Sequence, residues 1–320
     1  MATRIIFLGT PEFALPSLQA LLEAPDDLLT VVGVVTQPDR RAGRGQKLQA
    51  PPVKRLAESA QLPLCQTASL KKDPQALEWV RALQPDLMAV VAFGQILIRE
   101  HFDLPAHGTL NVHASLLPLY RGAAPAAHAI LQGESVSGVT IMKIDEGMDS
   151  GDTLTRKAIS IGGNTTRGEL EEVLAQEGAQ LLLETIPGYL SGEIRPQPQD
   201  HQKATLAPRI TKEDGQIDWS ESAIQVHNRI RACNPWPGAS TTFRGQPLKI
   251  WESRLVAGHS APVDLQPGEV AQAKAHLTVC CSGQTLLRLT VVQPPNRRRL
   301  TASDFINGFQ PRIGESLGGS

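Results

Sequence analysis

Short, uninterrupted apolar segments recur through the first half of the chain. Those with the length of a strand buried on both faces are residues 4–8, 30–35 and 86–92. Between the first two, residues 13–22 carry apolar side chains at intervals of three and four positions, which indicates an amphipathic helix. Further strand candidates are residues 108–113 and 138–144. This alternation of strands and helices predicts an α/β fold around a parallel sheet with right-handed crossovers.

A longer helix is predicted to begin at Thr166. Thr166 and Glu169 have the spacing of a capping box, in which each side chain accepts a hydrogen bond from the backbone N–H of the other residue. The residues predicted on the apolar side of this helix are Leu170, Val173, Leu174 and Leu181.

The pattern changes after this helix. Residues 191–203 are polar and rich in proline, without apolar periodicity, which is typical of a connection between domains. Beyond residue 240 the apolar segments are short and β-rich, separated by Gly, Pro and Asn, and they favour a small barrel. The barrel strands are predicted at 248–251, 277–281 and 286–292. We therefore divide the chain into a domain over 1–190, a linker over 191–205 and a second domain over 206–320.

Composition supports a folded, soluble protein of two domains. The chain has 320 residues, of which 41% are hydrophobic and 20% charged, enough to bury a full core. Its longest apolar stretches, such as 87–93, fall well short of the roughly 20 residues that a membrane span requires. Because a strand-like segment begins within the first few residues, we expect no targeting segment and a cytoplasmic protein. The cysteines lack metal-ligand spacing and are expected to be reduced and mostly buried.

The net charge of −1 hides an uneven distribution. Residues 1–200 hold 17 Lys and Arg against 23 Asp and Glu, whereas residues 201–320 hold 14 against 9. An excess of basic residues is often only a solvated face, but this one also fits a second domain that meets an anionic partner.

The strongest candidate for chemistry is the pair Asn111 and His113. Side chains two positions apart on a strand point to the same face, so an amide and an imidazole would lie side by side. The amide can donate to an oxygen that becomes negative in a transition state, and the imidazole can move a proton near neutral pH. A structural histidine at the end of a strand is the alternative, and for an isolated Asn-x-His pattern it would be preferred.

An acidic loop over 145–152 favours the catalytic interpretation of His113. A carboxylate from the loop, such as Asp149, can hydrogen-bond His113 and fix its tautomer. Acidic residues interspersed with glycines can also bind calcium or magnesium, although no calcium-loop spacing is present. Serine nucleophile chemistry is disfavoured because no Gly-x-Ser-x-Gly motif occurs. We therefore favour acid–base and oxyanion chemistry without a metal.

Two other loops carry weaker signals. Gly9, between the first strand and the first helix, is a single glycine and not a dinucleotide fingerprint, so a tight turn is the simpler interpretation. Residues 38–47 form a glycine-containing loop rich in arginine, which suits phosphate binding. Alone, such a loop is usually solvated; with the basic second domain it suggests one edge of a nucleic-acid interface.

Several motifs together closely resemble the methionyl-tRNA formyltransferases. The segments that carry the resemblance are 7–13, 37–39, 111–118, 121–125, 149–152, 217–220 and 230–237. They span almost the whole chain. Asn-x-His with Ser-Leu-Leu-Pro is by itself shared with other formyltransferases that use 10-formyltetrahydrofolate, so the combination of motifs is what makes the resemblance specific. Phe93, Ala114 and Arg41 stand where tyrosine, glycine and proline are common in the family.

The resemblance implies a Rossmann-like formyltransferase domain followed by an OB-like β-barrel that binds tRNA. It implies transfer of a formyl group from 10-formyltetrahydrofolate to the α-amino group of methionyl initiator tRNA, which yields N-formylmethionyl-tRNA for translation initiation. We expect no metal, no contact with a membrane and a monomer.

The same resemblance assigns roles to individual residues. The catalytic residues it implies are Asn111, His113 and Asp149. The folate-binding residues are Phe93, Gly94, Gln95, Ile96, Leu97, Ser115, Leu116, Leu117 and Pro118. The residues expected to contact tRNA are Arg40, Arg41, Arg44, Lys47 and Arg209.

Two alternatives remain at this point. A folate-dependent formyltransferase acting on a small amine would keep the catalytic trio but would not need the arginine-rich loop. A non-catalytic RNA-binding protein would explain the charge distribution but would leave the trio without a purpose.

Overall fold

The computed structural model describes residues 2–25, 27–42, 45, 47–258, 261–262 and 264–318. The chain forms two compact units. Unit 1 contains residues 1–122, 137–159 and 171–206, and unit 2 contains residues 123–136, 160–170 and 207–320. Within the described residues, no helix is both long and apolar enough to cross a bilayer.

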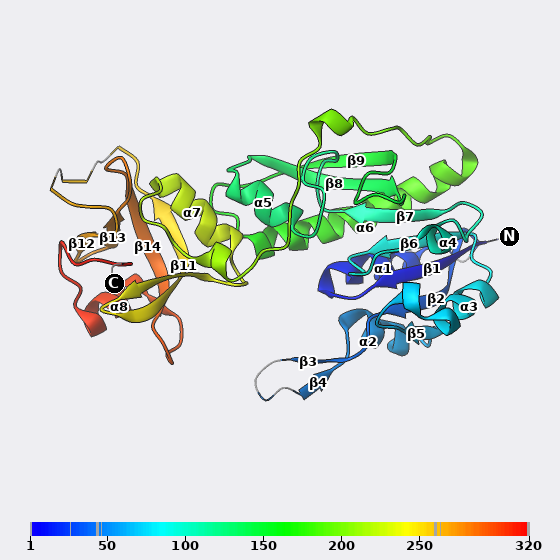
Figure 1. The fold of residues 1–320 in the computed structure, drawn as a ribbon, viewed down its shortest axis with the longest axis horizontal. Helices are drawn as coiled ribbons and strands as arrows, with labels where there is room; N and C mark the ends of the chain where they lie inside the picture. The colour runs from blue at the N-terminus through cyan, green and yellow to red at the C-terminus, as the bar shows by residue number, and fades with distance from the viewer. Residues whose placement is uncertain are drawn as a thin grey trace. The chain divides into compact units, whose positions relative to one another are not determined.

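Unit 1 is built on a seven-stranded sheet in the order β5-β2-β1-β6-β7-β8-β9 (Figure 1). Its strands are β1 (Thr3–Gly9), β2 (Leu29–Thr36), β5 (Leu64–Gln66), β6 (Leu87–Val91), β7 (Thr109–His113), β8 (Val136–Lys143) and β9 (Thr153–Ser160). Pairing is parallel from β5 through β7, which confirms the predicted α/β class, whereas β8 runs antiparallel to β7. Ile5 to Leu8 of the central strand β1 are completely buried, as expected of a strand covered on both faces.

Short helices connect these strands. They are the 3-10 turn η1 (Glu12–Ala14), α1 (Leu15–Glu23), α2 (Pro52–Ser59), the 3-10 turn η2 (Leu70–Lys72), α3 (Pro74–Ala82) and α4 (Arg99–Phe102). The 3-10 turn η3 (His201–Lys203) lies after the last strand of the sheet. At the turn between β1 and η1, a Cβ atom on Gly9 would lie 2.6 Å from a ring carbon of Phe7 and 2.9 Å from Cβ of Ala14. Close packing therefore accounts for this glycine.

The long helix α6 (Arg167–Ser191) begins as predicted. The backbone N–H of Thr166 donates to Oε2 of Glu169 over 2.8 Å, and the N–H of Glu169 donates to Oγ1 of Thr166 over 3.3 Å. Leu170, Leu174 and Leu181 are buried, but Val173 is 45% exposed, so its prediction was wrong. At 100° per residue Val173 lies about 60° around the helix from Leu170, at the edge of the apolar side.

Unit 2 contains an antiparallel sheet in the order β10-β11-β14-β13-β12, with β15 paired to β14. The strands are β10 (Ala239–Phe243), β11 (Gln246–Leu255), β12 (Val270–Ala273), β13 (Leu277–Cys280), β14 (Leu286–Gln293) and β15 (Leu300–Thr301). The N–H of Leu317 donates to the carbonyl of Gly268, and that of Gly318 to the carbonyl of Thr242. Residues 316–318 thereby join the end of β10 to the start of β12 and complete a barrel.

Short helical segments accompany the sheet of unit 2. They are α5 (Pro125–Leu131), the 3-10 turn η4 (Glu213–Gly215), α7 (Ala223–Ala232) and α8 (Ala302–Phe309). Val226 and Ile230 of α7 and Phe305 of α8 pack into one apolar cluster with inward-facing residues of the strands.

As predicted, the four cysteines are free thiols and mostly buried, and burial raises the pKa of Cys233 to about 11 and that of Cys281 to about 12.

A separate two-stranded hairpin carries the arginine-rich loop of unit 1. It consists of β3 (Arg40–Ala42) and β4 (Lys47–Gln49), which pair antiparallel (Figure 1). The sequence predicted a loop here and not a hairpin.

Candidate active site

Strand β7 places Asn111 and His113 on one face, as the alternation of side chains requires. Asn111 is partly exposed, and His113 is buried, with 5% of its surface accessible. On the neighbouring strand β8, Met142 lies opposite Asn111 and Thr140 lies opposite His113. The amide therefore has access to a bound molecule beside a largely enclosed imidazole.

The ring of His113 faces two acceptor oxygens. Its Nε2 lies 3.0 Å from the carbonyl oxygen of Tyr120, and its Nδ1 lies 3.6 Å from Oδ2 of Asp149. A neutral imidazole has one N–H, so it can donate to only one of these oxygens, whereas the imidazolium can donate toward both. Each ring nitrogen therefore has an acceptor oxygen in front of it.

The same carboxylate oxygen, Oδ2 of Asp149, accepts a hydrogen bond from the backbone N–H of Gly122 over 2.8 Å. Asp149 itself adopts a positive φ of 50°, a conformation that is uncommon for residues other than glycine. The structure thus brings Asp149 beside His113, as the sequence suggested.

The acidic loop reaches His113 by a different route from the one that the predicted parallel sheet implies. Because β8 is antiparallel to β7, the loop after β8 begins at the amino end of β7, where the N–H of Ile144 donates to the carbonyl of Thr109. His113 stands at the opposite end of β7. The loop must therefore return along β7 to bring Asp149 to the imidazole.

Another acid of the same loop, Asp145, is engaged locally. Its carboxylate accepts hydrogen bonds from the N–H of Gly147 over 3.0 Å and from Oγ of Ser150 over 2.9 Å. In the part of the chain that the structure describes, no three His, Cys, Asp or Glu side chains come together as a set of metal ligands.

The loop that follows β7 is fixed by hydrogen bonds to the backbone. Thr140 Oγ1 donates to the carbonyl of Ser115 over 2.7 Å and accepts from the N–H of Leu117 over 3.1 Å. The hydroxyl of Ser115 donates to the carbonyl of Leu119 over 2.6 Å. Of the four residues expected to bind folate here, Ser115 and Leu117 are buried, whereas Leu116 and Pro118 are partly exposed.

The loop after β6 contains the other five residues expected to bind folate. Phe93 and Leu97 are buried in the core and anchor the two ends of the loop, while Ile96 is 82% exposed. The side chain of Gln95 turns inward, accepting from the N–H of Leu70 and donating to the carbonyl of Thr67, both over 2.7 Å. The backbone and Ile96 are therefore the parts of this loop that a ligand can reach most readily.

Two residues to which sequence reasoning gave no role hold this loop in place. Nε2 of Gln37 donates to the carbonyl of Phe93 over 2.8 Å, and Oγ1 of Thr10 donates to the same oxygen over 3.0 Å. Both lie in segments that carry the family resemblance, and that was the only signal that singled them out.

The residues expected to contact tRNA separate into two groups. Arg40, Arg41 and Lys47 are exposed on the β3–β4 hairpin, where Arg40 also donates to Oε1 of Gln37. Arg209 is exposed in unit 2. Arg44 lies outside the described residues.

The hairpin is fixed to unit 1 beside Asp39. The hydrogen bond that Gln66 donates lowers the pKa of Asp39, and Lys54, whose Nζ lies 3.0 Å from the carboxylate, lowers it further. Asp39 is therefore charged at neutral pH, and it anchors the base of a strongly basic element.

The polar segment before unit 2 also reaches the site. Gln197 pairs with Thr153 at the start of β9, and Gln199 is only 7% exposed. Its amide contacts the acidic loop and the side chain of Arg121, which is 9% exposed. This burial could not be predicted from the sequence, because glutamine in a proline-rich segment is normally solvated.

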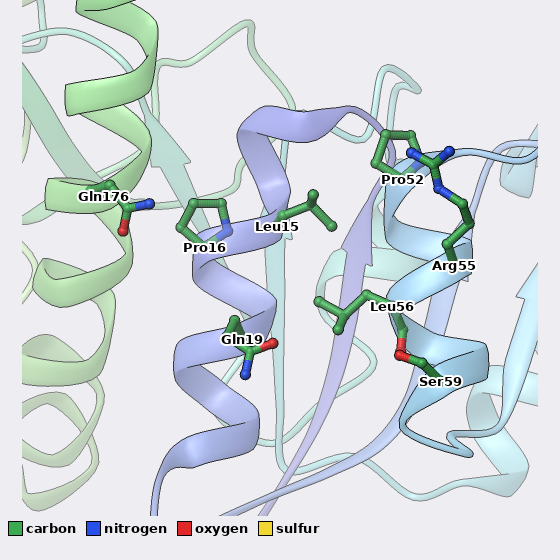
Figure 2. Close-up of a pocket in the computed structure, with 8 residues that line it drawn as sticks. All are labelled: Leu15, Pro16, Gln19, Pro52, Arg55, Leu56, Ser59 and Gln176. Atoms are coloured by element: carbon green, nitrogen blue, oxygen red, sulfur yellow. The ribbon is translucent and has the colours of Figure 1, made fainter.

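A hollow elsewhere in unit 1 is separate from this site. A hollow of about 510 Å³ opens between α1, α2 and α6, lined by residues such as Leu15, Leu56 and Gln176 (Figure 2). The residues that line this hollow do not include Asn111, His113 or Asp149. Among its lining residues Arg55 is the one with an ionisable side chain, so the hollow lacks the groups needed for proton transfer.

Comparison with known proteins identifies formyltransferases as relatives of this chain. Residues 3–186 match the formyl transferase family model, and residues 209–310 match that of the formyl transferase C-terminal domain. The methionyl-tRNA formyltransferase of Magnetococcus marinus is 44% identical over 317 residues, covering 99% of both chains.

Solved structures share the fold at lower identity. The methionyl-tRNA formyltransferase from Clostridium thermocellum is similar with a TM-score of 0.53 at 18% identity, covering 80% of this chain and 95% of that one. The sugar 3N-formyl transferase WlaRD is similar with a TM-score of 0.68, also at 18% identity, covering 92% of this chain and 99% of that one. The fold is thus common to enzymes with different acceptors.

Proposed function

Because this chain belongs to the methionyl-tRNA formyltransferase family, we propose that Asn111, His113 and Asp149 carry out its reaction. The reaction transfers the formyl group of 10-formyltetrahydrofolate to the α-amino group of methionyl initiator tRNA. The observation that carries the proposal is the placement of Asn111 and His113 on one face of β7, with the carboxylate of Asp149 3.6 Å from the imidazole.

The first step is attack of the methionyl amine on the formyl carbon. A C–N bond forms, and the formyl oxygen becomes an oxyanion. The Asn111 amide is an N–H donor suited to that oxygen, and the imidazolium of His113 stabilises the same negative charge. Both groups are held on a strand of the central sheet, so little reorganisation accompanies the reaction.

The second step breaks the bond between the formyl carbon and N10 of the folate. The amine nitrogen must lose a proton and N10 must gain one, so that both products leave neutral at these atoms. We assign the relay of this proton to His113, directly or through a water molecule. Asp149 orients the ring and balances the positive charge that it carries in the protonated state.

Donor binding is assigned to the loops after β6 and β7, residues 93–97 and 115–118. An apolar side chain such as Ile96, exposed on a loop whose two ends are buried, offers a surface for the flat pteridine ring. Hydrogen bonds from Thr10 and Gln37 hold the carbonyl of Phe93, which keeps this surface in place. An exposed apolar side chain beside backbone polar groups suits the chemistry of a folate ring.

Contact with the acceptor RNA is assigned to Arg40, Arg41, Arg44 and Lys47 of the hairpin region and to Arg209 of unit 2. Guanidinium groups bind phosphate oxygens through paired hydrogen bonds, so exposed arginines suit the RNA backbone. The two family models, which match 3–186 and 209–310, support a formyltransferase domain followed by a tRNA-binding domain; residues 191–205 connect the two in sequence and pack with unit 1. We place the enzyme in the cytoplasm, where charged tRNA is used, and propose that it acts as a monomer.

The decisive experiment measures formyl transfer from 10-formyltetrahydrofolate to methionyl initiator tRNA, with free methionine and small aminosugars as competing acceptors. We expect formylation of the charged tRNA alone. Efficient formylation of a free amine would favour the small-amine enzyme, and RNA binding without any transfer would favour the non-catalytic alternative.

A further inference from the structure

Gln199 uses its entire amide group inside unit 1. Nε2 donates to the carbonyl of Asp149 over 2.9 Å and to the carbonyl of Gly151 over 2.7 Å. Oε1 accepts from Nε of Arg121 over 3.2 Å and from Nη2 of the same guanidinium over 2.7 Å. At 7% exposure, Gln199 is a fully satisfied polar side chain in a segment whose neighbours Gln197 and Asp200 are exposed.

These contacts join the two parts of the chain that fix the carboxylate of Asp149. One is the backbone of Asp149, held in the left-handed conformation at a φ of 50°. The other is Gly122, which follows Arg121 and whose N–H donates to that carboxylate over 2.8 Å. Gln199 therefore connects the donor and the acceptor of the bond that orients Asp149 toward His113.

We propose that Gln199 is a positioning residue for the reaction, acting on His113 through Asp149. The proposal rests on the catalytic role assigned to Asp149 above. Gln199 does not touch the reacting atoms; it sets the distance between Asp149 and the imidazole by fixing the backbone on both sides of the carboxylate.

Glutamine is well suited to this position because it donates and accepts at once. A glutamate could still accept from Arg121, but it has no N–H for the two carbonyls and would place a negative charge against them. An alanine removes both sets of bonds. The two substitutions therefore separate the link to the acidic loop from the link to Arg121.

The test compares Gln199→Glu and Gln199→Ala with Gln197→Ala, a change in the same segment at an exposed side chain. We expect both Gln199 variants to lower kcat by roughly 10- to 100-fold, because small misplacements of catalytic groups are costly. The KM for 10-formyltetrahydrofolate should stay within about twofold and Gln197→Ala should be unchanged. Both Gln199 variants should still be folded at the assay temperature, although the lost buried hydrogen bonds lower their melting temperature.

A double-mutant cycle separates positioning from general destabilisation. If Gln199 acts through Asp149, Gln199→Glu should have little further effect on kcat in an Asp149→Asn background. The full loss reappearing in that background would overturn the proposal, as would a parental kcat in both Gln199 variants while Asp149→Asn is impaired. If Asp149→Asn itself kept the parental kcat, the proposed function of Asp149 would fail, and this inference with it.

Discussion

Nδ1 of His113 lies 3.6 Å from Oδ2 of Asp149, just beyond the range of a direct hydrogen bond. A bound substrate can shorten such a distance, since catalytic hydrogen bonds are often long until the reacting complex forms. The imidazole is held more firmly on its other side, where Nε2 lies 3.0 Å from the carbonyl of Tyr120. The histidine is thus anchored at one nitrogen and coupled to a carboxylate at the other.

Replacing His113 removes the proposed proton relay. His113→Ala should lower kcat by about 10²-fold or more while the protein stays folded. The exposed His107, in the turn before the same strand, provides the control, and His107→Ala should retain the parental rate. Steady-state kinetics and thermal unfolding of both variants check the prediction. Loss of activity only in step with a collapse of the melting temperature would indicate a structural histidine.

Asn111 is expected to act as the oxyanion donor. Asn111→Asp keeps the size of the side chain but removes both N–H groups, and Asn111→Ala removes the group entirely. Each should lower kcat by roughly 10²- to 10³-fold, the loss expected for one oxyanion donor. Single-turnover assays with saturating donor and charged tRNA measure this step. A parental rate in the aspartate variant would show that the amide donates to nothing in the transition state.

Asp149→Asn tests the charge of the third residue without removing its side chain. The amide oxygen can still accept from the N–H of Gly122, so the loop should keep its shape. We expect unchanged folate affinity and a kcat lowered by about 10²-fold. Folate titration and steady-state kinetics measure the two quantities. Activity that required an added divalent metal and disappeared with a chelator would instead support a metal-binding role for the loop.

The basic hairpin should contribute to tRNA binding and not to donor binding. Arg41 and Lys47 suit this test better than Arg40, because Arg40 also contacts Gln37, which supports the loop at Phe93. Arg41→Ala combined with Lys47→Ala should raise the KM for charged tRNA and leave the KM for folate unchanged. The salt dependence of tRNA binding should weaken by about one counterion for each phosphate that the double variant no longer neutralises.

A matched change of charge elsewhere controls for nonspecific attraction. Lys71 and Lys72 are exposed basic neighbours in η2, and replacing both with alanine should leave the KM for tRNA near that of the parent. Equal effects of the two double variants would mean that the hairpin adds only general charge.

The stability of unit 2 should fall in mild acid because of His227. Burial lowers the pKa of this histidine below its usual value of 6.5. Its ring is held by Ser253 Oγ at Nδ1 and by the carbonyl of Gly163 at Nε2, both at 2.8 Å. The unfolded chain binds a proton near pH 6.5 while the folded one does not, so the stabilisation is present above pH 6.5 and is lost as the pH falls below it.

Denaturant unfolding at pH 7.5 and pH 5.5 measures this effect. Trp219, Trp236 and Trp251 lie in unit 2, so tryptophan fluorescence reports chiefly on that unit. The unfolding equilibrium constant should rise with acidity by up to about 10-fold per pH unit from this one group. His227→Gln should be less stable at pH 7.5 but should lose this part of the pH dependence. An identical pH dependence in the variant would contradict the assignment.

Local periodicity made two features predictable from the sequence. They are much of the central sheet and the position of Asn111 and His113 on one face of a strand. Buried parallel strands are continuous apolar runs, and side chains two apart on a strand share a face. The capping box at Thr166 and Glu169 is equally local. Val173 was misassigned because a four-residue pattern defines the centre of a helix face better than its edge.

Features that depend on distant pairing could not be predicted. The antiparallel direction of β8 sets the path of the loop that carries Asp149, and nothing in the sequence of that loop specifies the direction. The burial of Gln199 depends on Gln197 pairing with Thr153, 44 residues earlier in the chain. Polar residues without periodicity give no sign of such contacts.

The order of segments along the chain has a consequence for how this protein could be altered by recombination. The chain changes unit five times, because residues 123–136 and 160–170 belong to unit 2 although they lie within the span of unit 1. In this chain α5 packs against α7, and the carbonyl of Gly163 contacts the ring of His227. If the C-terminal part of a relative replaced this chain after residue 206, α5 and Gly163 would face a helix and a side chain from a different protein. A functional chimera would have to exchange residues 123–136 and 160–170 as well. Unit 2 is therefore built from three separate segments of the chain and is not a detachable module.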